Sequence, residues 1–294
     1  MRIGIYGTEL NDDFILDIQN LLKRLDKEAE SLAIHSDFAE HLAQKNVALP
    51  AHHSFQDHQD LTTHVEVLFS IGGDGTFLNT LLLVRDSGIP VIGINTGRLG
   101  FLAYIATNRI DQSLDALLSD HYSVKERTLL SVETEEEIFG ETNYGLNEVA
   151  VHKKDTSSMV IIHIHIDGKF LTSYWADGLI ISTPTGSTAY NLSCGGPIVA
   201  PNTDCFIITP KAPHNLTVRP LVVKDDVEIS MRVECRDKDD QFLLSMDSRS
   251  VSYDSDKEII IRKAPFNLNI VRPEGSYFFK TMRRKLKWGL DSRN

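Results

Sequence analysis

The chain has 294 residues, 41% of them hydrophobic and 24% charged, which is typical of a globular protein with room for two domains. Its formal net charge is -11, from 30 basic and 41 acidic side chains. This balance argues against a broad nucleic-acid-binding surface, because such surfaces neutralise phosphates with Lys and Arg. The three cysteines include no CxxC pair, so they indicate neither a disulfide framework nor a zinc site.

No signal peptide or membrane-spanning segment is expected. The first residues, MRIGIYGTEL, lack the apolar core and the small-residue cleavage site of a signal peptide. No apolar run approaches the roughly 20 residues that cross a bilayer. We therefore expect a cytoplasmic protein with reduced thiols and with no membrane or nucleic-acid partner.

The first 122 residues alternate strand-like and helical patterns. The stretch DDFILDIQNLLKRLDKEAE, for example, places its apolar residues on one helical face. Such alternation predicts a Rossmann-like α/β domain with a parallel sheet covered on both faces. Residues 49–64 are polar and rich in histidine, and we interpret them as a loop with solvated side chains. The expected strands are RIGIYG, SLAIHS, VEVLFSIG and GIPVIGIN.

The pattern changes at about residue 120, and the second half is mostly β. Segments such as YSVKERTLLSVETEE, SMVIIHIHIDGKFL and EIIIRKAPFNLNIVRP mix alternation with β-branched residues. They predict a β-rich, sandwich-like domain over 123–275. From about 276 the apolar residues return to helical spacing, so we expect a C-terminal helix that packs back on the first domain. That domain then comprises residues 1–122 plus 276–294.

A glycine turn is the first motif with chemical meaning. In VEVLFSIGGDGTFLNTLLL, residues 65–83, a strand leads through glycines into a helix, which aims backbone N–H groups at an anion. A carboxylate beside a phosphate is repelled unless it has a use. Asp74 is thus a helix N-cap, a metal ligand or a proton acceptor. The turn lacks both the lysine of a P-loop and the GxGxxG spacing of a dinucleotide-binding turn.

A second glycine-rich loop and a polar pair follow. The loop GINTGRLGFLAY, residues 93–104, comes after a parallel strand, so it is expected to face the same crevice as the glycine turn. In LNEVAVHK, Asn147 and Glu148 place an amide beside a carboxylate. Such a pair can hold the adjacent hydroxyls of a ribose, or it can be a solvated turn that enters a strand.

The most specific run is YWADGLIISTPTGSTAYNLSCGGPIV, residues 174–199. A strand opens into a stretch of hydroxyl groups, glycines and one aromatic ring. Ser187 or Thr188 could serve only to cap the short helical turn that follows. The density of polar groups exceeds what a cap needs, and it suits a nucleotide.

At these four places the sequence resembles the NAD kinase family, in the order and spacing of GGDGT, INTGRLGFL, NE and DGLIISTPTGSTAYNLSCGGPIV. The GGDG turn alone is shared with diacylglycerol and sphingosine lipid kinases and resembles a turn of 6-phosphofructokinase, whereas the TPTGSTAY run narrows the resemblance to NAD kinases. The resemblance implies an α/β domain, a β-rich domain and NAD bound between them. It also implies a homotetramer, or at least a homodimer, in which a neighbouring subunit completes the site.

The implied reaction transfers the γ-phosphoryl group of ATP, with Mg²⁺, to the 2′-hydroxyl of the adenosine ribose of NAD, which gives NADP. Asp74 is then the catalytic residue and accepts the hydroxyl proton late, because phosphoryl transfer depends more on positioning than on early deprotonation. No residue is assigned as a ligand of a resident metal. The residues that the resemblance assigns to NAD and ATP are Gly73, Asp74, Gly75, Thr76, Phe101, Asn147, Glu148, Trp175, Asp177, Thr188, Ala189, Tyr190, Asn191, Leu192, Ser193 and Arg249.

Two positions depart from the family pattern. Trp175 stands where many members have a basic residue, and Arg249 stands where a glutamine is common. Arg249 either restores the missing positive charge or is simply exposed. Two other functions remain open at this point: a lipid kinase that uses the same turn, and a nucleotide sensor without turnover. His163 and His165 share a strand face but have no third metal ligand at a suitable spacing.

Overall fold

The computed structural model describes residues 1–97, 100–154, 159–235, 241–273 and 278–289. The chain divides into two compact units, the first formed by Met1–Glu126 with Leu268–Asn294 and the second by Arg127–Asn267. The sequence placed the boundaries near 122 and 276. The division instead falls inside two long strands, β7 (Tyr122–Thr134) and β18 (Glu258–Pro273), each of which contributes to both units.

The first unit is built on a parallel sheet with the strand order β3-β2-β1-β4-β5, followed by the end of β18. The chain therefore moves outward from β1 in one direction and then returns to add β4 and β5 on its other side. Its strands are β1 (Arg2–Gly7), β2 (Ser31–His35), β3 (His53–Phe55), β4 (Val67–Gly72), β5 (Val91–Asn95) and β6 (Ile105–Ala106). Its helices are α1 (Ile15–Glu28), α2 (Ser36–Gln44), α3 (His58–His64), α4 (Asp74–Val84), α5 (Ile110–Leu118) and α7 (Phe278–Leu286).

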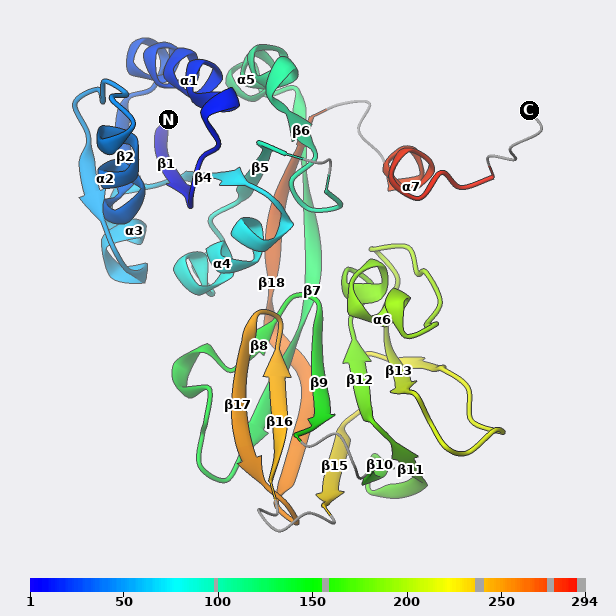
Figure 1. Cartoon of the computed structure of the whole chain (residues 1–294). Helices are drawn as coiled ribbons and strands as arrows, with labels where there is room; N and C mark the ends of the chain where they lie inside the picture. The colour runs from blue at the N-terminus through cyan, green and yellow to red at the C-terminus, as the bar shows by residue number, and fades with distance from the viewer. Residues whose placement is uncertain (98–99, 155–158, 236–240, 274–277, 290–294) are drawn as a thin grey trace. The chain divides into compact units, whose positions relative to one another are not determined.

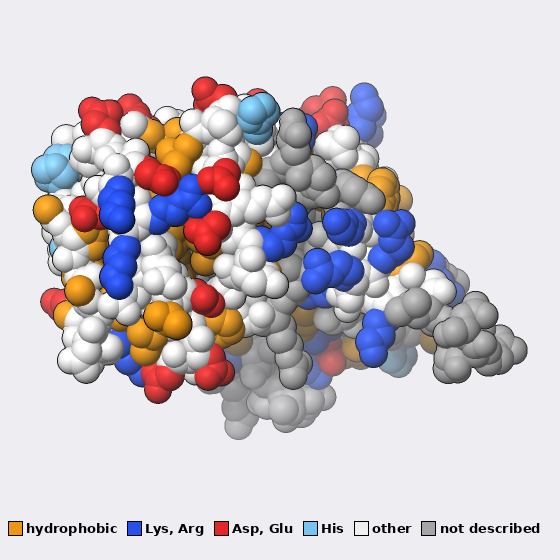
Figure 2. All heavy atoms as spheres, turned by 90° about the horizontal axis from the view of Figure 1, so that it is seen from above, with side chains coloured by type: hydrophobic (Ala, Val, Ile, Leu, Met, Phe, Trp, Pro, Cys, Tyr) orange, Lys and Arg blue, Asp and Glu red, His pale blue; other side chains and the backbone are white. Residues whose placement is uncertain are grey.

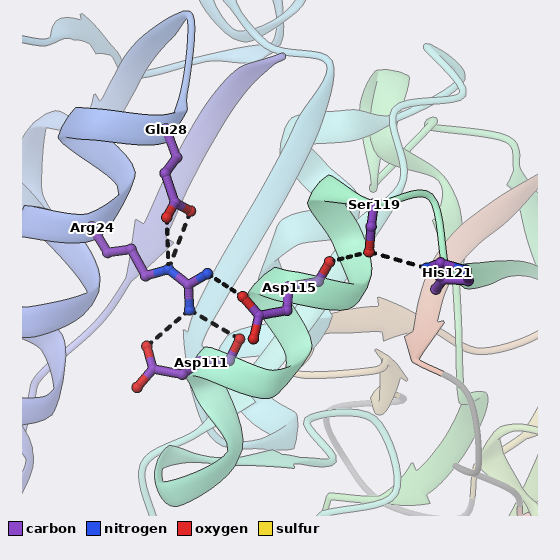
Figure 3. A network of polar contacts seen from close by, with 6 residues as sticks. All are labelled: Arg24, Glu28, Asp111, Asp115, Ser119 and His121. Atoms are coloured by element: carbon purple, nitrogen blue, oxygen red, sulfur yellow. Dashed lines mark hydrogen bonds and ion pairs between the residues drawn. The ribbon is translucent and has the colours of Figure 1, made fainter.

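Helices cover both faces of this sheet, as alternation of strands and helices predicts (Figure 1). Arg24 of α1 joins α5 through ion pairs with Asp111, at 3.1 Å, and Asp115, while it also pairs with Glu28 one turn further along α1. Figure 3 shows the guanidinium at the centre of this network. These contacts fix the two helices side by side, although ion pairs so near solvent add little stability.

Residues 49–64 are not the loop that their polarity predicted. They contain the short strand β3 and the helix α3, because Phe55 and Leu61 are fully buried. The Asp57 side chain caps α3 by accepting the N–H of Asp60 at 3.0 Å. Two buried side chains and one cap are therefore enough to order this segment, in which His52 and His53 are exposed while His58 and His64 are half-buried.

The second unit packs two sheets against each other around an apolar core. One sheet contains β11-β10-β15-β18 together with β7 and β8, and the other has the order β14-β13-β12-β9-β16-β17. This is the β-rich sandwich expected from the sequence. Besides β7 and β18, the elements are β8 (Tyr144–Gly145), β9 (Glu148–Lys153), β10 (Val160–Ile166), β11 (Lys169–Ala176), β12 (Gly178–Ser182), α6 (Tyr190–Ser193), β13 (Cys205–Lys211), β14 (Leu221–Lys224), β15 (Ile229–Glu234), β16 (Gln241–Met246) and β17 (Arg249–Asp254).

Candidate active site

The glycine turn lies at the point where the strand order of the first unit reverses. It follows β4, which pairs with β1. Strands β2 and β3 lie on one side of β1, and β4 and β5 lie on the other. The crevice at such a switch point, beyond the carboxyl ends of the strands, is where open α/β sheets bind ligands. The hydroxyl of Thr8, just after β1, lies 2.9 Å from that of Thr76, in the first turn of α4. This contact joins the end of β1 to the helix that follows β4.

Asp74 is not the cap of its own helix. It stands at the first position of α4, where its side chain makes no capping hydrogen bond. Its carboxylate instead accepts the backbone N–H of Phe101 at 2.8 Å and those of Leu102 and Ala103 at 3.0 Å. The two glycine-rich loops therefore meet, as their places at neighbouring strand ends predicted. Gly100 is required here, since a Cβ at that position would lie 1.8 Å from an Asp74 oxygen.

Asp74 also has a cationic neighbour on α7. The Lys285 ammonium lies 3.4 Å from Asp74 Oδ2 and 4.7 Å from the centre of the Phe101 ring. The Phe101 and Phe278 rings are 6.1 Å apart, which confirms that the C-terminal helix packs on the first unit. Lys and Arg side chains gather over α7 (Figure 2). The turn has no lysine of its own, and α7 provides one.

Gly73 and Gly75 have no structural reason to be glycine within the chain. Neither has a positive φ, and a Cβ added to either would meet no atom within 4 Å. The open space therefore lies over the backbone N–H groups at the start of α4. A bound anion that approaches this backbone closely would account for both glycines.

In the second unit, the Asn147–Glu148 pair is held by a buried aspartate that sequence reasoning missed. Asp247 accepts the backbone N–H groups of Leu146, Asn147 and Glu148 at 2.8, 2.8 and 3.2 Å. The Asn147 carbonyl in turn crosses Gly186, where a Cβ would lie 2.1 Å from that oxygen. The pair is thus a rigid turn against the TPTGSTAY run. No local pattern points to Asp247, because it is 100 residues from Asn147 along the chain.

Glu148 has an unusual protonation equilibrium. Burial raises the pKa of its carboxyl to about 8, with a further upward contribution from the charge of Asp247, while a hydrogen bond from the Tyr190 backbone acts in the opposite direction. Its Oε2 atom is buried and has no partner among the described residues. At neutral pH this side chain is therefore largely a neutral acid, which can donate a hydrogen bond to a ligand as well as accept one.

Stability should report this shifted pKa directly. Between about pH 4.5 and 8 the folded protein keeps a proton on Glu148 that the unfolded chain has lost, so unfolding becomes easier as the pH rises through this interval. In Glu148→Gln this contribution is absent, and the free energy of unfolding should fall less steeply with pH. Urea titrations of both proteins at several pH values measure the slopes. Equal slopes would contradict the assigned pKa.

The TPTGSTAY run wraps around a fully buried asparagine. Asn191 donates to the carbonyls of Ser187 and Pro197 at 3.2 and 3.1 Å and accepts the hydroxyl of Thr209 at 2.6 Å. Its amide is therefore used inside the protein and shapes the loop. Tyr190 is half-buried, and its ring lies 5.6 Å from both the Lys211 ammonium and the His152 ring. Thr188, Ala189 and Leu192 are also half-buried beside it, and Ser193 is exposed.

Trp175 lies near the end of β11, and Asp177 stands between β11 and β12. Asp177 pairs with Lys153 at 2.7 Å, and its backbone N–H donates to the Lys211 carbonyl at 3.0 Å. Trp175 is 37% exposed. Two cations therefore lie beside the residues of these motifs: Lys153 pairs with the Asp177 side chain, and Lys211 contacts the Asp177 backbone and the Tyr190 ring. No motif in the sequence indicated either lysine.

Arg249 is not simply exposed, and it lies near Asp247, whose charge acts on its guanidinium. Its guanidinium donates to the carbonyls of Thr142 and Tyr144, the latter at 2.7 Å, and stands 5.6 Å from the Phe139 ring. The side chain is half-buried, and burial lowers its pKa. Donors committed to backbone carbonyls fix the segment around Thr142, so Arg249 already has a structural role.

The described residues were compared with the arrangements that hold metal ions. Within the described ranges, no group of three His, Cys, Asp or Glu side chains is arranged to hold a metal ion. His163 bonds Ser173 at 2.7 Å and Glu234 at 2.8 Å, which accounts for both ring nitrogens. In the same part of the chain, no helix is both long enough and apolar enough to span a bilayer.

The comparisons with known proteins agree with these motifs. Residues 17–122 match the ATP-NAD kinase N-terminal domain, and residues 146–273 match the ATP-NAD kinase C-terminal domain. The NAD kinase of Cytophaga hutchinsonii is 44% identical over 295 residues, which cover all of both chains. The chain belongs to the NAD kinase family.

Three further proteins are similar to the chain at lower sequence identity. The NAD kinase of Bacteroides fragilis is 39% identical over 294 residues, again over all of both chains. An NAD kinase of Archaeoglobus fulgidus, solved with ATP, has a TM-score of 0.73 at 26% identity and covers 98% of each chain. Yeast NADH kinase, solved with NADH, has a TM-score of 0.87 at 22% identity over 98% of this chain and 88% of the other. The last of these supports the fold alone.

Proposed function

We propose that this protein transfers the γ-phosphoryl group of ATP to the 2′-hydroxyl of the adenosine ribose of NAD, which yields NADP. The observation that carries the proposal is the glycine turn, where an aspartate in a fixed orientation lies beside open backbone N–H groups at the start of α4. Membership of the NAD kinase family supplies the identity of the acceptor. It also argues against a lipid substrate.

The donor phosphates are expected at Gly73, Gly75 and Thr76. Backbone N–H groups at a helix N-terminus bind phosphate oxygens, and the open sides of the two glycines leave room for them. Mg²⁺, carried by ATP and coordinated mainly by phosphate and water oxygens, would offset charge on the group being transferred. The only carboxylate at the turn, within the described residues, is Asp74, so the chain itself contributes little to holding the metal.

Asp74 would orient the acceptor hydroxyl and take its proton as the new bond forms. A carboxylate offers about four acceptor positions, of which three hold the loop N–H groups and the fourth faces Lys285. An incoming hydroxyl would therefore take the place of Lys285. The displaced ammonium would remain close enough to stabilise the transferring phosphoryl group.

The NAD contacts are proposed for the second unit. Asn147 and the largely neutral Glu148 would bind ribose hydroxyls, and the Tyr190 ring would stack on the base. Lys153 holds Asp177 ready to accept an amide or amine of NAD. Thr188 to Ser193 would line the pocket, with Asn191 acting through the shape of the loop. Trp175 would add apolar contact, and Arg249 would act only through the segment it fixes. Phe101, in the first unit, would add apolar contact beside Asp74.

We also propose a cytoplasmic homotetramer. In the second unit, the edge strand β11 exposes Phe170 and Leu171 by 61% and 36%, as well as Trp175. Exposed apolar side chains on an edge strand favour a partner. Light scattering on the purified protein would measure the assembly.

Activity itself is the test of the proposal. Purified protein is incubated with NAD, ATP and Mg²⁺, and NADP is detected with an NADP-specific dehydrogenase. Formation of NADP that requires ATP is expected. Absence of NADP above background would overturn the proposal and favour a nucleotide sensor that keeps the fold without turnover.

A further inference from the structure

A buried arginine in the first unit has no part in the reaction proposed above. Arg272 lies near the end of β18, two residues after Ile270, which pairs with Val91 of β5. Its side chain is 8% exposed, and its Nε atom has no hydrogen-bond partner among the described residues. Burial lowers the pKa of the guanidinium, which nevertheless stays charged at neutral pH.

Burial of this charge opposes folding. A guanidinium that leaves water without a matching acceptor loses its hydration, and an apolar side chain of similar volume would fill the same place with less loss of stability. An orphaned polar group in a folded protein therefore calls for an explanation. At Arg272 the explanation has to come from what the cation contacts.

Arg272 contacts an aromatic ring. Its guanidinium carbon lies 4.7 Å from the centre of the Tyr104 ring, which is within the range of a cation–π interaction. This attraction is stronger where water is excluded. Tyr104 is half-buried and stands between Ala103 and Ile105, which are both buried. The cation thus holds the ring from the end of β18.

Tyr104 directly follows the residues that hold the carboxylate of Asp74. The backbone N–H groups of residues 101–103 donate to that carboxylate, and the Ala103 carbonyl accepts the side-chain amide of Asn95 at 3.1 Å. After Tyr104 the chain enters β6, which pairs with β5. Any movement of the Tyr104 ring would therefore reach the Ala103 N–H first, and through it Asp74.

We propose that Arg272 is a positioning residue for phosphoryl transfer, which clamps Tyr104 and so fixes the loop of residues 101–103 that orients Asp74. The inference rests on the proposed kinase function for the role of Asp74. Phosphoryl transfer depends on the placement of the reacting groups, so a small displacement of this carboxylate lowers the rate. The NAD contacts proposed for the second unit are left intact.

Two measurements on Arg272→Met test the proposal, because methionine keeps apolar volume at this place without the cation. Hydrogen exchange in a peptide that covers residues 100–106 should become about tenfold faster, since the N–H groups held by Asp74 open more often. The kcat for NADP formation should fall about tenfold, while KM for NAD stays within about twofold of wild type. Arg272→Lys, which keeps a cation, should recover part of both losses.

A second variant and a control complete the design. Tyr104→Leu should show the same two losses, and the double variant with Arg272→Met should lose no more than either single variant, because both remove one interaction. Arg262→Met is the matched control on the same strand. Arg262 forms surface ion pairs with Glu133 and Glu228, so its loss should change neither measurement.

The competing outcomes are separable. Wild-type exchange in a folded Arg272→Met would overturn the proposal, as would losses that multiply in the double variant. Faster exchange with an unchanged kcat would also overturn it, because the loop would then not set the rate. Melting temperatures identify a variant that fails to fold, and Tyr104→Leu and Arg272→Lys then carry the test. Exchange requires no substrate, so absence of NADP formation by the wild-type protein would count against the kinase function, while the exchange rates still decide the clamp.

Discussion

Asp74→Asn is expected to lower kcat by about 10²- to 10⁴-fold, while the affinities for NAD and ATP stay within a few-fold of wild type. The amide keeps one oxygen for the N–H groups of Leu102 and Ala103, so most of the loop contact survives. It cannot accept the proton of the acceptor hydroxyl. Steady-state kinetics with separate titrations of NAD and ATP measure the two effects.

A matched control lies at the other end of the same helix. Asp86, just after α4, is exposed, and its carboxylate makes a long contact with His58, at 3.9 Å. It has no role in the proposed reaction, so Asp86→Asn should leave kcat unchanged. In Asp74→Asn the new NH₂ group faces the Phe101 N–H, so one of the three loop hydrogen bonds is lost and the two to Leu102 and Ala103 remain. Full turnover in Asp74→Asn would remove this residue from its assigned role.

Asp247→Asn is expected to destabilise the protein by about 2–4 kcal/mol, since an amide can satisfy only part of a set of three buried N–H donors. The variant should also bind NAD poorly, because these donors set the turn that carries Asn147 and Glu148. The pKa of Glu148 should fall as a neighbouring charge disappears. Urea denaturation and NAD titration are the measurements.

Asp256→Asn is the control for backbone conformation. Asp256 is an exposed turn residue with a φ of 60°, close to the 52° of Asp247, so both positions need a residue that tolerates left-handed geometry. The control should cost less than about 0.5 kcal/mol. An equal loss of unfolding free energy in the two variants would mean that Asp247 contributes only through its left-handed backbone conformation and not through its three hydrogen bonds.

Much of the fold could be predicted because the spacing of apolar residues along the chain follows which side chains are buried. The strands and helices of the first unit follow apolar runs and helical spacing. Strand β13 escaped the prediction. Its sequence, CFIITPK, contains Pro210, and a proline within an apolar run argues against a strand. Residues 49–64 were misread because Phe55 and Leu61 are too few to produce a period.

The motifs identified the site, but its contacts are long-range. Nothing near Asp74 in the sequence indicates that its partners are N–H groups of residues 101–103 or an ammonium at Lys285. Local patterns left Asp74 open as a helix cap, a metal ligand or a proton acceptor, and the structure shows no capping hydrogen bond from its side chain. Asp247 and Arg272 were missed because their contacts are long-range as well. The role of a single polar residue can be assigned only when its neighbours in the folded structure are known.

The most direct test follows the phosphoryl group to its acceptor. ATP labelled at the γ-phosphorus is incubated with the protein, Mg²⁺ and either NAD or its analogue lacking the 2′-hydroxyl of the adenosine ribose. We predict label in the 2′-phosphate of NADP from NAD and none in the deoxy analogue. Label in the analogue, or none in either dinucleotide, would contradict this prediction.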